Sequence, residues 1–260
     1  MEKSRLRPTI LMTAALLFPW ALANAQQQSV DESAEPAIEP SAIAALEKMS
    51  AYLRTLKTYE LQAETTTDEV LESGQKIQFG NTVNYRVQMP DRLFVDVASD
   101  RKQRQYFYDG KTVTLYAPRM KYYAVFDAPT SIRETVDAAQ DKYAIDMPLS
   151  DLFLWGTEAA STEDLTDAIE IGPSMIGDEQ CDHYAYRQED VDWQLWIRQG
   201  EQPLPCKLVI TTTDEESQPQ YSAVMTWNLT PTIDPAGFTF VAPDDAHKIA
   251  IRPADTETQD

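Results

Sequence analysis

Residues 221–229 read YSAVMTWNL, and this segment has the clearest alternation of side chains in the chain. Apolar or aromatic side chains recur at every second position, namely Tyr221, Ala223, Met225, Trp227 and Leu229. Successive side chains of a β-strand point to opposite faces of the sheet, so a period of two predicts a strand with one buried face. The fold is therefore expected to rest on an antiparallel β-sheet.

Other segments on both sides of the mid-chain region repeat this period. Val83, Tyr85 and Val87 alternate with polar neighbours. The pair Asp109-Gly110 is a strong signal for a β-hairpin turn, because these residue types tolerate the positive φ angles that such turns need. The patterns predict about eleven strands in an antiparallel meander, at residues 59–68, 82–88, 93–97, 106–108, 113–115, 122–126, 169–176, 181–187, 193–198, 208–212 and 221–229.

Two segments have a helical period instead. From Pro40-Ser41 to about Thr58, apolar residues recur at three- and four-residue spacing, which predicts an amphipathic N-terminal helix. A second helix is predicted from Pro129-Thr130 to about Tyr143, in the middle of the chain. It is followed by the unusually apolar residues 149–155.

The N-terminus has the pattern of a secretory signal peptide, residues 1–25. Three basic residues precede an apolar run at residues 10–22, and Ala23-Asn24-Ala25 is a small-x-small cleavage site. The alternative, a membrane anchor, is disfavoured because the 13-residue run contains Pro19 and is shorter than the roughly 20 residues that span a bilayer. Cleavage after Ala25 would deliver a soluble, not membrane-embedded, protein to the periplasm. The predicted organisation is a signal peptide (1–25), a disordered leader (26–40), a single β domain (41–250) and a tail (251–260).

The chain is strongly acidic, with 42 acidic and 22 basic residues and a formal charge of −20. Such a surface repels nucleic acid, so no nucleic-acid partner is expected. The two cysteines, Cys181 and Cys206, flank a predicted hairpin, and an oxidising compartment favours a disulfide between them. No metal site and no cofactor are predicted, because the two histidines, His183 and His247, lie in unrelated places.

The search for catalytic motifs gives no candidate. The chain contains no G-x-S-x-G, no H-E-x-x-H and no Gly-rich phosphate loop. His183 lies two residues from Cys181, but a disulfide would occupy that thiol. We therefore expect a protein that is not an enzyme.

Three short motifs resemble a known family. They are Tyr108-Asp109-Gly110-Lys111, Pro148-Leu149-Ser150-Asp151-Leu152 and the closing pattern formed by Phe238, Phe240 and Pro243. With the order of signal peptide, helix, meander and mid-chain helix, they resemble the lipoprotein-localisation-factor (LolA/LolB-like) superfamily. The branch that the chain resembles most is an uncharacterised group of predicted periplasmic proteins.

The resemblance implies a mainly β fold, an incomplete and strongly bent antiparallel β-barrel of about 11 strands. An N-terminal helix and a mid-chain helical lid would close its open side over an apolar cavity that accepts acyl chains. The carrier of this superfamily has a lid arginine, for which Arg133 is the candidate here. The receptor has an N-terminal lipidated cysteine, which this chain lacks.

A barrel of this size leaves a cavity unless large side chains fill it. The residues predicted to form the cavity wall and lid are Tyr85, Leu93, Val95, Tyr106, Tyr108, Val113, Leu115, Ile132, Val136, Leu152, Trp155, Trp193, Leu195, Ile197, Met225 and Trp227. Such stripes also occur in an ordinary filled core, which is the alternative at each position. Trp155 lies outside the strands and is a candidate for a lid or for a contact with a partner.

Two functions of different classes fit these features. The first is a monomeric, carrier-like periplasmic protein that binds a lipid or an acylated protein. The alternative is a regulatory or sensory module that binds an envelope protein. Proteins of the second kind in the same superfamily carry a further C-terminal domain, and we expect none in a chain of this length, which disfavours the alternative.

Overall fold

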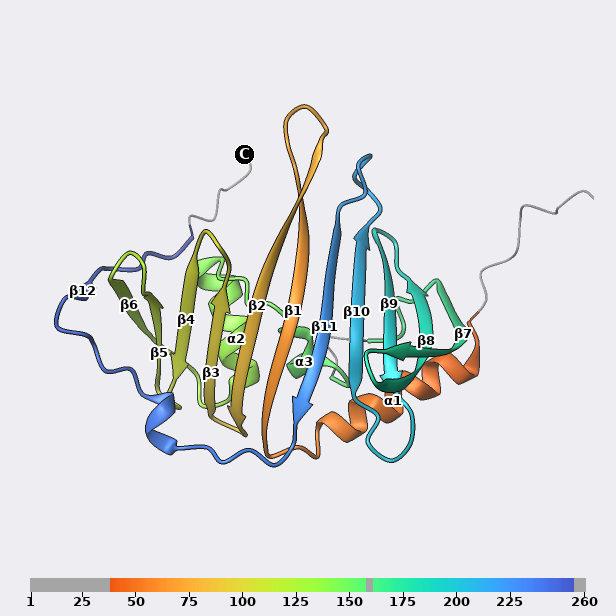
Figure 1. Ribbon diagram of the computed structural model, residues 1–260, viewed down its shortest axis with the longest axis horizontal. Helices are drawn as coiled ribbons and strands as arrows, with labels where there is room; N and C mark the ends of the chain where they lie inside the picture. Colours follow the sequence, from red (N-terminus) through yellow and green to blue (C-terminus); the bar gives the residue numbers. More distant parts are fainter. Residues whose placement is uncertain (1–37, 158–160, 255–260) are drawn as a thin grey trace, which may run out of the picture. The chain divides into compact units, whose positions relative to one another are not determined.

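The alternating segments pair into one open, curled sheet of twelve strands in the computed structural model, which describes residues 38–157 and 161–254 (Figure 1). The strands are β1 (Thr58–Val70), β2 (Lys76–Gln88), β3 (Arg92–Ala98), β4 (Gln103–Tyr108), β5 (Thr112–Ala117), β6 (Tyr122–Asp127), β7 (Asp167–Ile176), β8 (Glu179–Arg187), β9 (Val191–Arg198), β10 (Pro205–Thr212), β11 (Gln220–Asn228) and β12 (His247–Lys248). The predicted fold class is confirmed, and the eleven predicted strands all form. The twelfth strand, β12, pairs with β6 in parallel and was not predicted.

The strand order is β12-β6-β5-β4-β3-β2-β1-β11-β10-β9-β8-β7. Two meanders, β1 to β6 and β7 to β11, therefore meet where β1 pairs with β11. In this seam Leu61 lies opposite Trp227 and Ala63 lies opposite Met225. Because β6 and β7 lie near opposite edges of the sheet, the chain between them has to cross its full width.

That crossing segment contains α2 (Ile132–Tyr143) and α3 (Asp151–Leu154), which lie on the concave side of the sheet (Figure 1). Ser131 begins α2 with a reciprocal cap, because its Oγ accepts a hydrogen bond from Glu134 N at 3.3 Å and donates one to Glu134 Oε2 at 2.8 Å. Ile132, Val136 and Ala139 form the apolar side of α2 and are buried. The mid-chain region thus covers the sheet with an amphipathic helix, as predicted.

The N-terminal helix, α1 (Pro40–Leu53), packs at the other end of the concave face, nearest to β7. Leu46 and Met49 are buried on its inner side. The helix ends five residues before the predicted Thr58, because residues 54–57 already turn the chain into β1. Leu56 still packs against the core from this turn, which explains why it continued the apolar pattern.

The C-terminal segment after β11 follows the lower edge of the sheet in Figure 1, through a 3-10 helix, η2 (Pro235–Phe238), to β12. Phe238 is buried, and the ring of Phe240 packs on the convex side against Phe107, Tyr116 and Tyr123 at centroid distances of 5.0 to 5.3 Å. These contacts attach the segment to the outer face of β4, β5 and β6.

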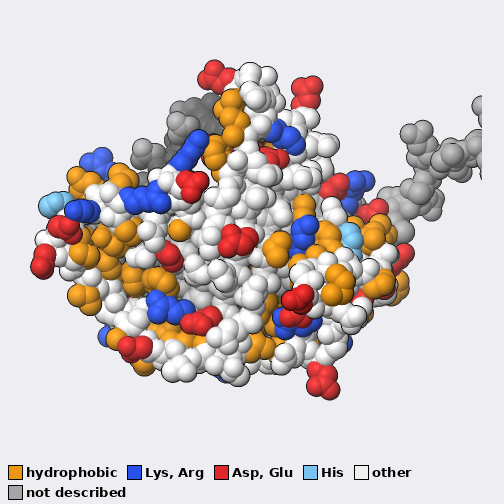
Figure 2. All heavy atoms as spheres, in the orientation of Figure 1, with side chains coloured by type: hydrophobic (Ala, Val, Ile, Leu, Met, Phe, Trp, Pro, Cys, Tyr) orange, Lys and Arg blue, Asp and Glu red, His pale blue; other side chains and the backbone are white. Residues whose placement is uncertain are grey.

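The predicted disulfide between Cys181 and Cys206 forms and links β8 to β10 across β9. Both sulfurs are buried beside Trp196 on the convex face. Seen from this outer side, the centre of the sheet carries few apolar side chains, and these gather toward both ends (Figure 2). The disulfide therefore lies in a small apolar cluster separate from the main core.

The predicted signal peptide and its cleavage site lie outside the described residues. Within residues 38–157 and 161–254, none of the helices has the length and apolar character needed to cross a bilayer.

Candidate functional site

Three tyrosine hydroxyls attach the covering segments to the concave face of the sheet. Tyr85 Oη donates to the carbonyl of Pro148, before α3, and Tyr108 Oη donates to the carbonyl of Pro129, before α2, at 2.6 Å. Tyr186 Oη donates to the carbonyl of Ala42 in α1 at 2.9 Å. Burial raises the pKa of all three phenols, so each remains a donor at neutral pH.

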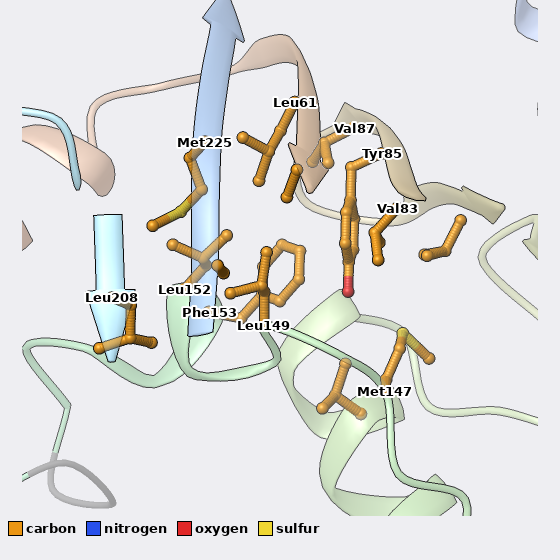
Figure 3. Packing of buried hydrophobic residues seen from close by; sticks show 14 of the residues in the cluster. Leu61, Val83, Tyr85, Val87, Met147, Leu149, Leu152, Phe153, Leu208 and Met225 are labelled. Atoms are coloured by element: carbon orange, nitrogen blue, oxygen red, sulfur yellow. The ribbon is translucent and has the colours of Figure 1, made fainter. Parts of the chain in front are cut away.

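The half of the concave face beneath α2 is filled. The predicted wall residues on β2 to β5 that are buried there are Tyr85, Leu93, Val95, Tyr106, Tyr108 and Val113, and they pack in one core with Ile132 and Val136. Leu115 is half-buried and packs against the same core. Figure 3 shows Met147, Leu149 and Phe153 reaching toward Tyr85 from the crossing segment. This half of the sheet is consequently a packed core.

The other half contains a cavity of about 320 Å³ between α1, α3 and strands β9 and β10. Its lining residues are Leu46, Asp151, Trp155, Ser161, Leu165, Gln188, Val191, Trp193, Leu208 and Ile210. Most of these side chains are apolar, and three polar groups converge among them. A largely apolar cavity of this size with a few polar groups is the usual form of a small-molecule site.

Of the predicted wall residues, Trp155 and Trp193 line this cavity. Leu152, Leu195, Ile197 and Met225 are buried in the surrounding core, and Trp227 is half-buried, with its Nε1 donating to the Pro205 carbonyl at 2.8 Å. The prediction missed Leu46, Leu208 and Ile210 as lining residues. Leu46 belongs to the apolar stripe of the N-terminal helix, and the other two alternate along a predicted strand. The signal was present, but it did not show over which strands the helices leave a space.

Two polar groups, Asp151 in the cavity lining and Tyr221 on the neighbouring strand, are unusual. Burial, and then the nearby Asp146 carboxylate, raise the pKa of Asp151 above its ordinary value. Burial, and then the charges of Asp151 and Asp146, raise the pKa of Tyr221. Tyr221 shares a face of the sheet with Ile210, its cross-strand neighbour. Among the described residues, its buried Oη has no hydrogen-bond partner.

Replacing Asp151 with Asn is expected to change the pH dependence of stability. Because the folded protein holds the Asp151 proton more tightly than the unfolded chain, this group destabilises the fold increasingly as pH rises above its ordinary pKa of 3.8. The charges of Asp146, Tyr85 and Tyr221 act on the same site. The stability of D151N relative to the unmodified protein should therefore increase with pH from about 4 and level off once the folded-state carboxyl has ionised. Urea unfolding at a series of pH values measures this difference in stability. A difference that does not change with pH would contradict a raised pKa of Asp151 in the folded protein.

A second hollow, of about 500 Å³, adjoins the cavity and shares Leu46, Trp155 and Ser161 with it. Arg54, after α1, donates from Nη1 to the carbonyl of Gly156 at 3.0 Å. This contact joins the end of α1 to the segment that follows α3. It holds Trp155 at the boundary between the two spaces.

Replacing Gly156 with Ala is expected to lower the free energy of unfolding by about 1–2 kcal/mol, because Gly156 has φ +76° and a side chain there is strained. The new Cβ would also overlap Arg54 Nη1, so the arginine has to leave its position. Chemical unfolding measures the loss. Gly177→Ala, at φ +57° and with open space where the new Cβ would lie, is the control that separates backbone strain from displacement of Arg54.

Arg133, the candidate lid arginine, donates from Nε to the carbonyl of Phe153 at 3.2 Å. It therefore connects α2 to α3 within the crossing segment.

His183 lies on the convex face, where its ring stacks on Trp196 at 3.9 Å and its Nε2 contacts Gln194 Oε1 at 3.0 Å. Among the described residues, His, Cys, Asp and Glu form no group suited to hold a metal ion.

An open, curled sheet that is covered by helices on its concave face, with a largely apolar cavity beneath them, defines a half-barrel with a helical cover. The chain belongs to the DUF2092 family of predicted periplasmic proteins, whose model matches residues 42–252. The predicted resemblance to a group of predicted periplasmic proteins is thereby confirmed.

Several solved structures are similar to this chain. The lipoprotein LppX from Mycobacterium tuberculosis is 10% identical, with a TM-score of 0.47, and the match covers 76% of this chain and 100% of LppX. LprF from Mycobacterium bovis is 12% identical, with a TM-score of 0.45 and coverage of 82% and 100%. A LolA superfamily protein from Nitrosomonas europaea is 11% identical, with a TM-score of 0.34 and coverage of 78% and 99%. No curated protein matches the sequence.

Proposed function

We propose that this protein is a carrier-like periplasmic binding protein that holds an acyl chain of a lipid or of a lipidated protein. The single observation that carries this proposal is the apolar cavity of about 320 Å³ between α1, α3 and β9–β10. Its role is binding rather than catalysis. The proposal includes export by the N-terminal signal peptide, with cleavage after Ala25, and a monomeric state.

The energetics of such a site favour acyl chains. Burial of one methylene group contributes about 0.8 kcal/mol, so burial of several carbons gives useful affinity without charge pairing. The indole rings of Trp155 and Trp193 add large apolar surfaces to the wall. A linear chain can follow the floor formed by Leu208 and Ile210 on β10. The cavity is therefore suited to part of one acyl chain rather than to a whole multi-chain lipid.

The first test is native mass spectrometry of the mature protein purified from a periplasm, followed by organic extraction. We expect a bound molecule that extracts as lipid. We also expect the polypeptide mass to be that of a chain that begins at Gln26. A protein without bound mass that also fails to bind a fluorescent fatty-acid probe would overturn the proposal. Recovery of a stoichiometric protein partner without lipid would support the regulatory alternative.

A filled-cavity variant makes the test specific. Ile210→Trp places a larger side chain at the cavity wall and should reduce lipid retention strongly. Val224→Trp is the matched control, because Val224 is 40% exposed and points away from the concave face. Circular dichroism shows whether both variants fold. Equal retention by two folded variants would contradict the assignment of the site to this cavity.

A further inference from the structure

Two polar groups, one in the cavity lining and one on the neighbouring strand, are not used by an acyl chain alone. Asp151 lines the cavity from α3, and Tyr221 lies on β11 opposite Ile210, which lines it from β10. The charge of Asp151 raises the pKa of Tyr221, so the carboxyl lies within electrostatic range of the phenol. The hydroxyls of Tyr85, Tyr108 and Tyr186 donate hydrogen bonds to the covering segments. By contrast, Tyr221 Oη is buried and has no hydrogen-bond partner among the described residues.

An unsatisfied buried hydroxyl is costly, and buried polar groups in folded proteins nearly always have partners. A ligand that brings a hydrogen-bonding atom beneath α3 would remove this cost. Tyr221 offers a donor. Asp151 in its protonated form offers a donor and an acceptor, and burial favours that form by raising its pKa.

The charges around this pair determine which polar group fits. None of the ten lining residues is a lysine or an arginine, and the nearby acidic groups are Asp146 and Asp151. An anionic headgroup beside Asp151 would lie next to carboxyl groups, with no lysine or arginine among the lining residues to pair with it. An ester carbonyl or a hydroxyl carries no charge, so it needs no cation and is not repelled by the carboxyl groups.

We infer that the cavity selects an amphiphile with an uncharged hydrogen-bonding headgroup, such as a monoacylglycerol, whose ester or hydroxyl group binds Tyr221 and Asp151. This inference rests on the proposed function, since it requires an acyl chain in the same cavity. It names the chemical class of the ligand and two residues that determine its selection.

The test uses three probes with the same or similar apolar part: monoolein, oleate and hexadecane. Each displaces an uncharged fluorescent probe, N-phenyl-1-naphthylamine, from the mature protein at neutral pH. We expect monoolein to bind at least about tenfold more tightly than oleate. Tyr221→Phe should weaken monoolein binding by about three- to tenfold, which is the usual contribution of one hydrogen bond, and leave hexadecane binding unchanged.

Tyr116→Phe is the matched control, because Tyr116 packs against Phe240 on the convex face. Asp151→Asn keeps a neutral hydrogen-bonding group and should retain monoolein binding, whereas Asp151→Leu should lose it. If monoolein and oleate bind equally and Tyr221→Phe changes neither, the inference about the headgroup is wrong while acyl binding stands. If none of the three probes binds, both the inference and the proposed function are wrong.

Discussion

Replacing both Cys181 and Cys206 with Ala is expected to lower the free energy of unfolding by about 3–4 kcal/mol. The disulfide closes a loop with a sequence separation of 25, and the entropy that it removes from the unfolded chain accounts for this value. Alanine is suitable because both side chains lie in an apolar cluster with Trp196. Urea unfolding with and without a reducing agent measures the effect.

The reduced form of the unmodified protein is the control for this double variant. It should unfold close to the variant, since both lack the same cross-link. A variant as stable as the oxidised protein would show that the disulfide does not constrain the unfolded chain. Acyl-probe binding should persist in any variant that remains folded, because the disulfide lies on the convex face, away from the cavity.

Replacing Phe153 with Ala is expected to lower the free energy of unfolding by about 3–5 kcal/mol, the usual cost of removing a buried aromatic ring. Phe153 is only 7% exposed, and its ring packs against that of Tyr85 at a centroid distance of 6.1 Å. With Leu152, it is one of the two residues by which α3 enters the core (Figure 3). Its loss should weaken the attachment of α3 to the sheet.

Calorimetry or urea unfolding measures this loss, and Phe153→Leu is the control that keeps an apolar group in place. Leucine should recover most of the stability. If alanine cost less than about 1 kcal/mol, the crossing segment would not be held by its core contacts, and the structural basis of the lid would be wrong.

The fold was largely predictable from the sequence because each strand carries its own alternation. The eleven predicted strands and both longer helices follow from periods that neighbouring residues define. The two-residue β12 has no such pattern, since His247 and Lys248 are both exposed and pair with β6 through the backbone. A short parallel bridge of this kind depends on where the preceding segment places the chain.

The candidate site was less predictable, for a physical reason. Tyr85 and Trp193 have similar patterns in the sequence, yet Tyr85 is buried beneath the crossing segment and Trp193 lines the cavity. The difference comes from which part of the concave face α2 and α3 cover. Asp151 belongs to one of the family motifs and Tyr221 to the alternating segment 221–229, but their relation appears only when α3 lies over the sheet.

The seam between β1 and β11 has a consequence for how the chain folds. Glu60 pairs with Asn228, so this central pairing joins residues that are 168 positions apart. Loop closure over such a distance is slow, and proteins dominated by distant pairings fold slowly. As the chain is synthesised from its N-terminus, the first meander would emerge with one side of β1 unpaired until β11 follows, and an exposed strand edge promotes aggregation. The newly made chain is therefore expected to depend on chaperones until its last long strand arrives.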